Sequence, residues 1–268
     1  MSTLFLAWQD PVGRNWLPIG RLTRGADHYE FSYLMGAKVA QETSGFETLE
    51  SFPDLKTVYR SDELFPIFSN RLPSPSRPDY ADFIQWLNVP LEAADPISLL
   101  ARSGGRRATD SLEVFPDAEP DQTGHFHIHF FAHGLRHFPK ESIDRINRLE
   151  EGERLLLCYD FQNPHDPKAL LLRTNDAFEG DRFLVGYCPR YLVEDAFKIL
   201  EAARGLSEVA VERINRPPAP LQVRLLCSLT AKWPKGFKPF SGPNFKPIGA
   251  ETQKSLLKRV KAMRHNDH

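Results

Sequence analysis

The sequence predicts an α+β fold in two domains, and three observations support this prediction. Short apolar runs, separated by glycine and proline turns, have the length and spacing of β-strands. A few other segments place apolar residues at helical spacing. Midway along the chain, residues 115–124 hold two prolines and three acids with little apolar content, which is typical of a linker. We therefore predict a first domain at residues 1–118, a second at 119–248 and a basic tail at 249–268.

In the first domain the pattern predicts a small sheet accompanied by helices. Strands are expected at residues 4–9, 18–23, 29–33 and 111–115. Helices are expected at residues 62–69, 80–87 and 96–103. The last helix has the clearest ends, because Asp95 is a good N-cap, Pro96 suits the first helical position and Gly104 suits the end.

In the second domain the pattern predicts a small antiparallel β-barrel with one or two helices. Strands are expected at residues 126–131, 154–159, 169–173, 182–187, 209–214 and 221–230. Helices are expected at residues 139–149 and 191–204, and the second of them has a clear apolar face. Many short strands with few helices favour a barrel.

Composition is that of a soluble globular protein without a membrane segment. The 268 residues are 41% hydrophobic and 26% charged. No apolar run approaches the roughly 20 residues that a membrane span needs. The three cysteines lie in apolar surroundings and form no CxxC pair, so we expect free thiols, a cytoplasmic location and no structural zinc. They are Cys158, Cys188 and Cys227.

The net charge of −1 hides a strongly basic C-terminal segment. Residues 231–268 hold nine lysines and arginines against two acids, a balance of +7, so the rest of the chain is −8. Such a tail can bind a polyanion by releasing counterions, or it can be a solvated amphipathic helix. Residues 233–240 interleave aromatics with lysines, which suits either a single nucleic-acid strand or a segment folded back over the barrel.

The most informative stretch is the polar turn at residues 159–169, which reads Tyr-Asp-Phe-Gln-Asn-Pro-His-Asp-Pro-Lys-Ala. It lies between two apolar strands and holds an amide, an imidazole and a carboxylate at Asn163, His165 and Asp166. Asn-Pro and Asp-Pro steps favour turns, because the residue before proline is disfavoured in the helical region. A polar turn on a small rigid sheet can present hydrogen-bonding groups to a ligand.

Two further segments complete a family pattern with this turn. Gly134-Leu135-Arg136-His137-Phe138 precedes it, and Val185-Gly186-Tyr187-Cys188-Pro189-Arg190 follows it. In this order and spacing the three segments resemble the HIRAN domain over roughly residues 121–232. HIRAN domains of eukaryotic remodelling helicases bind the 3′ ends of single-stranded DNA. The resemblance therefore implies that this chain binds nucleic-acid ends, with single-stranded DNA as the partner and no cofactor.

The resemblance also implies a set of nucleic-acid-binding residues. Arg136 and His137 stand where the family holds the terminal nucleotide, and guanidinium suits phosphate while a planar ring suits base stacking. The Asp166 carboxylate can accept a hydrogen bond from a 3′-hydroxyl. Asn163 and Asp166 can equally form Asx turns with their own backbone. His165 replaces the tyrosine that is common in the family, which weakens the expected stacking.

Four other positions of the pattern remain open between binding and structure. Lys168 and Arg190 flank the turn, where each either contacts phosphate or is solvated. Phe138 and Tyr187 either stack on a base or belong to the core. We include all four among the candidate binding residues and expect no catalytic residue.

Three segments of the first domain form a second family pattern. They are Gly20-Arg21-Leu22, Phe31-Ser32-Tyr33 and the phenylalanine-rich run at residues 64–73 that ends in Leu-Pro. Over about residues 1–118 they resemble the N-terminal subdomain of HipA-type toxin kinases. No kinase catalytic loop or DFG-like motif follows. The resemblance therefore implies docking of a separate protein partner, such as a HipA-type kinase.

Five histidines between residues 125 and 137 suggest a metal site at first sight. His125, His127 and His129 alternate along one predicted strand and project from one face. Same-face neighbours on a strand stand roughly 7 Å apart, so three in a row rarely converge on one ion. A polar outer face is the better interpretation, and we expect no metal. The sequence also lacks Walker, GxSxG and HExxH motifs.

Three functions follow for the whole chain. The first is a non-enzymatic bacterial accessory protein in a toxin–antitoxin or phage-defence system, whose second domain binds single-stranded DNA ends and whose first domain docks a HipA-type kinase. The second is a protein-interaction module without DNA binding, favoured by His165 and by the acidic balance outside the tail. The third and weakest is a metal-dependent nuclease that uses the histidine strand and Asp166.

Overall fold

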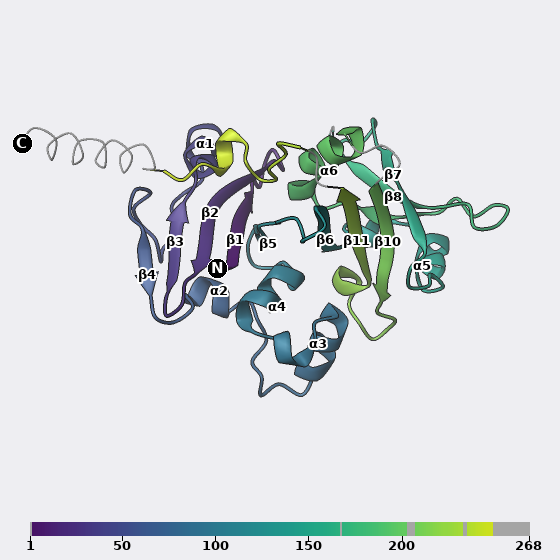
Figure 1. The fold of residues 1–268 in the computed structure, drawn as a ribbon, viewed down its shortest axis with the longest axis horizontal. Helices are drawn as coiled ribbons and strands as arrows, with labels where there is room; N and C mark the ends of the chain where they lie inside the picture. Colours follow the sequence, from purple (N-terminus) through teal and green to yellow (C-terminus); the bar gives the residue numbers. More distant parts are fainter. Residues whose placement is uncertain (1, 167, 203–206, 233–234, 249–268) are drawn as a thin grey trace, which may run out of the picture.

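The computed structural model describes residues 2–166, 168–202, 207–232 and 235–248. These residues form two antiparallel sheets that lie beside one another, with helices beneath and above their junction (Figure 1). The strand order is β4-β3-β2-β1-β5 in the first sheet and β6-β11-β10-β7-β8-β9 in the second. The expected basic tail at residues 249–268 lies outside the described residues. Within the described part, no helix has the length and apolar character that a membrane crossing requires.

The first sheet contains the strands that the sequence predicts and one more. Its strands are β1 (Ser2–Gln9), β2 (Trp16–Arg24), β3 (Tyr29–Tyr33), β4 (Tyr59–Ser61) and β5 (Leu112–Pro116). Its core is aromatic: the rings of Phe31 and Phe52 stack with centroids 4.0 Å apart, and Tyr33 and Phe68 are fully buried beside them.

Four helices accompany this sheet, and the predictions fit them unequally. They are α1 (Met35–Ser44), α2 (Pro66–Ser69), α3 (Tyr80–Leu87) and α4 (Pro96–Ser103), with the short turn η1 (Leu91–Ala93) between α3 and α4. The predictions for α3 and α4 are confirmed residue for residue. The predicted helix at 62–69 is wrong in its first half, because helix begins only at Pro66. Neither α1 nor β4 was expected.

The second sheet curls into a half-barrel rather than a fully bonded barrel. Its strands are β6 (His125–Phe131), β7 (Arg154–Tyr159), β8 (Leu170–Thr174), β9 (Leu184–Tyr187), β10 (Ser207–Ile214) and β11 (Leu225–Lys232). The two edges approach each other where His133 and Tyr187 exchange backbone hydrogen bonds, each with an N···O distance of 2.9 Å. The predicted strand at 221–230 begins later than expected, because Leu221–Val223 form the turn η3.

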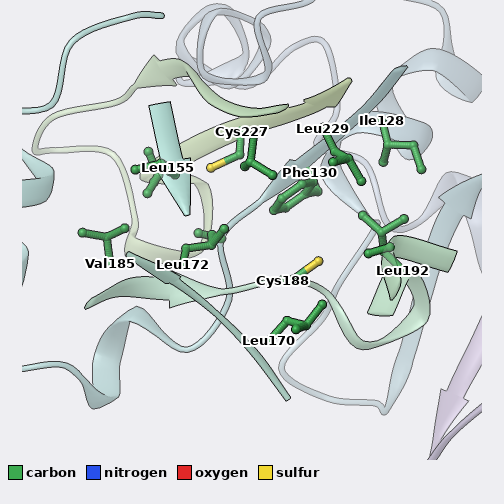
Figure 2. Close-up of a cluster of buried hydrophobic side chains, with 14 of the residues drawn as sticks. Ile128, Phe130, Leu155, Leu170, Leu172, Val185, Cys188, Leu192, Cys227 and Leu229 are labelled. Atoms are coloured by element: carbon green, nitrogen blue, oxygen red, sulfur yellow. The ribbon is translucent and has the colours of Figure 1, made fainter. Parts of the chain in front are cut away.

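Two helices and a short turn complete the second half. They are α5 (Lys140–Ile146), α6 (Arg190–Ala202) and η2 (Leu135–His137). The core inside the curled sheet contains Phe130, Leu172 and Leu192 together with the thiols of Cys188 and Cys227 (Figure 2). All three cysteines are free, as expected, although Cys158 is only half-buried.

The two halves are packed together, which the linker prediction did not anticipate. Phe115, inside the expected linker, is 1% exposed and stacks on Tyr191 of α6 with centroids 4.2 Å apart. The chain also returns to the first sheet after β11. The buried Phe240 joins the cluster around Phe115, and the Ile248 N–H donates to Tyr33 O at 3.0 Å. Residues 240–248, which the sequence division assigned to the second domain, therefore pack against the first sheet, with η4 (Pro243–Phe245) among them.

Candidate nucleic-acid interface

The side chain of Asn163 organises the polar turn between β7 and β8. Its Oδ1 accepts hydrogen bonds from the backbone N–H groups of His165 and Asp166, both at 3.0 Å. Its Nδ2 donates to Asp160 Oδ2 at 3.0 Å and to the Tyr187 hydroxyl at 3.3 Å. Both lone pairs and both hydrogens of the amide are therefore used. Asn163 makes the Asx turn that the sequence offered as one alternative, and it holds the turn in a single shape.

Asp166 and the two predicted cations near it are paired with one another or with neighbours. Asp166 Oδ1 accepts the Lys168 N–H at 2.9 Å, and Asp166 Oδ2 lies 3.1 Å from Arg190 Nε at the start of α6. Lys168 Nζ lies 3.0 Å from Glu194 Oε1. An ionised carboxylate offers about four acceptor positions. Asp166 therefore keeps acceptor capacity for a ligand, while Arg190 compensates part of its charge.

Tyr187 joins the turn to the Gly134–Phe138 segment. Its hydroxyl donates to Asp160 Oδ2 at 3.0 Å, and its ring lies 5.6 Å from that of Phe138, centroid to centroid. Burial raises the pKa of the Tyr187 hydroxyl, and the nearby Asp160 carboxylate raises it further. Gly134 has a φ of 75°, and a Cβ there would stand 2.9 Å from the Tyr187 ring, so this close approach requires glycine.

Arg136 and His137 stand somewhat apart from this group. Both are exposed on η2, and Arg136 Nε donates to His137 Nε2 at 3.0 Å. Among the described residues Arg136 has no carboxylate partner. Both side chains line a pocket on the side that faces the first sheet. The structure thus brings Phe138, Asn163, Asp166, Lys168, Tyr187 and Arg190 together, with His165 exposed on the turn, and turns Arg136 and His137 toward the junction.

The sequence reasoning missed one aromatic residue in the same turn. Phe161 is 81% exposed, and its ring meets that of Tyr159 edge-on with centroids 4.1 Å apart. An exposed ring on a turn held in one shape is suited to stacking on a base. The sequence could have indicated Phe161 by its position, because a phenylalanine inside a run of polar turn residues belongs to neither flanking strand.

The histidines of β6 are engaged in separate hydrogen bonds rather than gathered at one point. His125 Nδ1 lies 2.7 Å from Thr123 Oγ1, and His127 Nε2 lies 3.0 Å from Asp121 Oδ2. His129 Nδ1 bonds to Glu212 across the sheet. The opposite face of β6 is buried, as the alternation predicts. In the parts of the chain that the structure describes, no set of three or more His, Cys, Asp or Glu side chains is placed to hold a metal ion.

Comparison with known families and structures gives matches to part of the chain. Residues 125–233 match the model of the HIRAN domain. A crystal structure of a protein from Lactobacillus plantarum is 18% identical, with 40% of this chain and 97% of that chain covered and a TM-score of 0.30. The crystal structure of the HIRAN domain of human HLTF is also 18% identical, with coverages of 41% and 78% and a TM-score of 0.26. No curated protein matches the chain.

Proposed function

We propose that this protein binds the 3′ end of single-stranded DNA at the turn between β7 and β8. The HIRAN match is consistent with a nucleic-acid-binding role. The observation that supports the site is the meeting of the Asn163 turn with Phe138 across Tyr187. The same turn carries the Asp166 carboxylate, which pairs with the cation Arg190 and keeps acceptor positions, and the exposed ring of Phe161.

In this proposal each group has a defined role at the strand end. The Asp166 carboxylate accepts the 3′-hydroxyl, and Arg190, already 3.1 Å from it, is placed to contact the neighbouring phosphate. Phe161 and His165 offer exposed rings for the terminal bases. Asn163 acts indirectly, because its amide is fully used in shaping the turn. Hydrogen bonds to charged groups contribute about 1.5–3 kcal/mol, which corresponds to a preference of about tenfold or more for the correct end.

The experiment compares two oligonucleotides that differ only at the 3′ end, one with a hydroxyl and one with a phosphate, by fluorescence anisotropy. The intact protein should prefer the hydroxyl, because the carboxylate accepts from it and repels the phosphate. Asp166→Asn should lose this preference. Asp176→Asn is a matched control, since Asp176 is also an ion-paired acid of this half, bonded to Arg173 and Arg182 away from the turn. Equal affinity of the intact protein for both ends would refute end capture, and no binding at all would favour a protein-interaction module.

We propose further that the first half docks a separately encoded HipA-type kinase in a bacterial toxin–antitoxin or phage-defence system. The support is the sequence resemblance at residues 20–22, 31–33 and 64–73. The test is co-purification of this chain with a kinase from a neighbouring gene that lacks its own N-terminal subdomain. Co-elution at one-to-one stoichiometry is expected, and separate elution at concentrations well above the micromolar range would reject this partner.

A further inference from the structure

The pocket that Arg136 and His137 line, at the junction of the two halves, is lined by cationic side chains from both. It has a volume of about 270 Å³. The first half contributes Arg14 and Trp16 from the β1–β2 hairpin and Arg106 from the loop after α4. The second half contributes Arg136 and His137 from η2. Neither half could form this pocket without the other.

The positive charge of this pocket is not compensated by its lining. None of the lining residues is an acid. Among the described residues, Arg14, Arg106 and Arg136 make no salt bridge, although many other arginines do. The Glu113 side chain is 4% exposed and lies 3.3 Å from His133 Nε2, so its negative charge acts mainly on that imidazole and more weakly on Arg106. Three arginines that share one pocket without a carboxylate in its lining favour an anionic ligand.

The hairpin holds Arg14 in an uncommon backbone conformation. Its φ is 58°, in the left-handed region that residues other than glycine seldom adopt. The Arg14 N–H donates to Asp10 O at 2.9 Å, and Gln9 Nε2 donates to Arg14 O at 3.1 Å, so the turn is fixed from both sides. Backbone strain of this kind persists only where surrounding contacts impose it, and it often marks a functional position.

The loop that presents Arg106 is held by a buried arginine. Arg71, with a side chain 2% exposed, donates through Nη1 to Gly105 O at 2.8 Å and pairs through Nη2 with Asp110 Oδ2 at 2.7 Å. Gly104 and Gly105 both have positive φ, at 73° and 55°, and turn the chain sharply out of α4. Arg106 thus projects from a loop whose backbone is fixed by Arg71. The loop therefore loses less conformational freedom when Arg106 binds a ligand.

We propose that this pocket binds backbone phosphates of the same single strand whose 3′ end lies at the Asn163 turn, so that the first half is part of the DNA interface. This inference rests on the proposed function. Arg136 and His137 belong to the segment that reaches the turn through Phe138, which makes the two sites neighbours. Guanidinium groups suit phosphate, and the half-buried Trp16 offers a ring for a base.

The test measures the salt dependence of affinity for an oligothymidylate of about 12 nucleotides with a free 3′-hydroxyl. The variant is Arg14→Gln/Arg106→Gln. Removing one single-strand phosphate contact should flatten the slope of log affinity against log salt by about 0.7, hence by about 1.4 for two. If the variant and the intact protein bind equally at about 1 M salt, this change in slope makes the variant bind about 25-fold more weakly at about 0.1 M salt. Arg136 is left unchanged because the family resemblance also makes it a candidate for binding the strand end.

The control is Lys38→Gln/Arg107→Gln, which removes two exposed positive charges that lie outside the pocket. It should keep the slope of the intact protein, and both double variants should keep the preference for a 3′-hydroxyl and the melting temperature. An unchanged slope in Arg14→Gln/Arg106→Gln, with end preference intact, would overturn this inference and leave the proposed function standing. Equal flattening by the control would also overturn it, because a general field would then explain the effect. Absence of any binding by the intact protein would refute the proposed function itself.

Discussion

Replacing Glu212 with glutamine should loosen the contact between the two halves. Glu212 lies on β10 with a side chain 15% exposed, and it accepts hydrogen bonds from Asn88 at 2.9 Å and Arg102 at 2.8 Å in the first half. It also bonds to His129 on β6. Burial alone would raise the pKa of Glu212, but these hydrogen bonds and positive charges outweigh it and lower the pKa from 4.5 to about 2.

The magnitude follows from that difference in pKa. A fall in pKa from 4.5 to about 2, at about 1.4 kcal/mol for each pKa unit, corresponds to about 3 kcal/mol of stability at neutral pH. Because the folded pKa is the lower one, this contribution is complete above the unfolded value of 4.5 and is lost as the pH falls toward about 2. Glu212→Gln should therefore unfold at a lower urea concentration at neutral pH, and its difference from the intact protein should shrink on acidification.

Urea unfolding followed by tryptophan fluorescence measures this difference at neutral pH and at about pH 3. Glu208→Gln is the control on the same strand. Glu208 pairs with Arg154 at the surface, with side chains 43% and 66% exposed, so its removal should change stability by less than about 1 kcal/mol. A difference between Glu212→Gln and the intact protein that stays constant from neutral to acidic pH would refute the reasoning, because an uncharged contribution would then explain it.

Two further predictions concern close packing and the tail. Gly186→Ala should lower stability by about 1–3 kcal/mol in thermal unfolding, because φ is 148° and the new Cβ would stand 2.7 Å from the Ala132 Cβ. Gly124→Ala is the comparison, because it has a positive φ of 80° with open space around it, and it should cost less. Removing residues 249–268 should flatten the salt slope of DNA binding by about 0.7 for each phosphate that the tail binds, while end preference survives; an unchanged slope would mean that the tail does not bind DNA.

The elements that the sequence predicted well are those whose ends are encoded locally. Helix α4 begins where the Asp95 side chain accepts the Ile97 N–H at 3.0 Å and ends where Gly104 adopts a φ of 73°. Helix α1 has such a signal only at its end, where Gly45 adopts a φ of 67°, since its N-cap Leu34 makes no side-chain hydrogen bond. The position of α1 depends on a close contact with β2. A Cβ at Gly36 would stand only 2.1 Å from Pro18 O, so the helix can approach the strand only because residue 36 is glycine. Close approach between segments leaves no periodic pattern in the sequence.

The Asn163 turn and the junction pocket also differ in whether local sequence determines them. The Asn163 turn could be predicted because its hydrogen bonds join residues two and three positions apart. The junction pocket could not, since Arg14, Arg106 and Arg136 are far apart in the chain and only the packing of the two halves brings them together. The packing of the expected linker could not be foreseen for a related reason. Phe115 packs against Tyr191, Phe240 and Phe245, all of which lie in the second half of the chain.

Helix α6 connects the first half to the candidate end-binding turn. Its first residue, Arg190, pairs with Asp166, and its second, Tyr191, stacks on Phe115 of β5 with an interplanar angle of 7°. Two adjacent residues at the start of one helix thus contact the turn on one side and the first sheet on the other. A shift of the first half would move Tyr191 and with it Arg190. The position of Arg190 beside Asp166 is therefore linked, through the adjacent Tyr191, to the packing of Phe115.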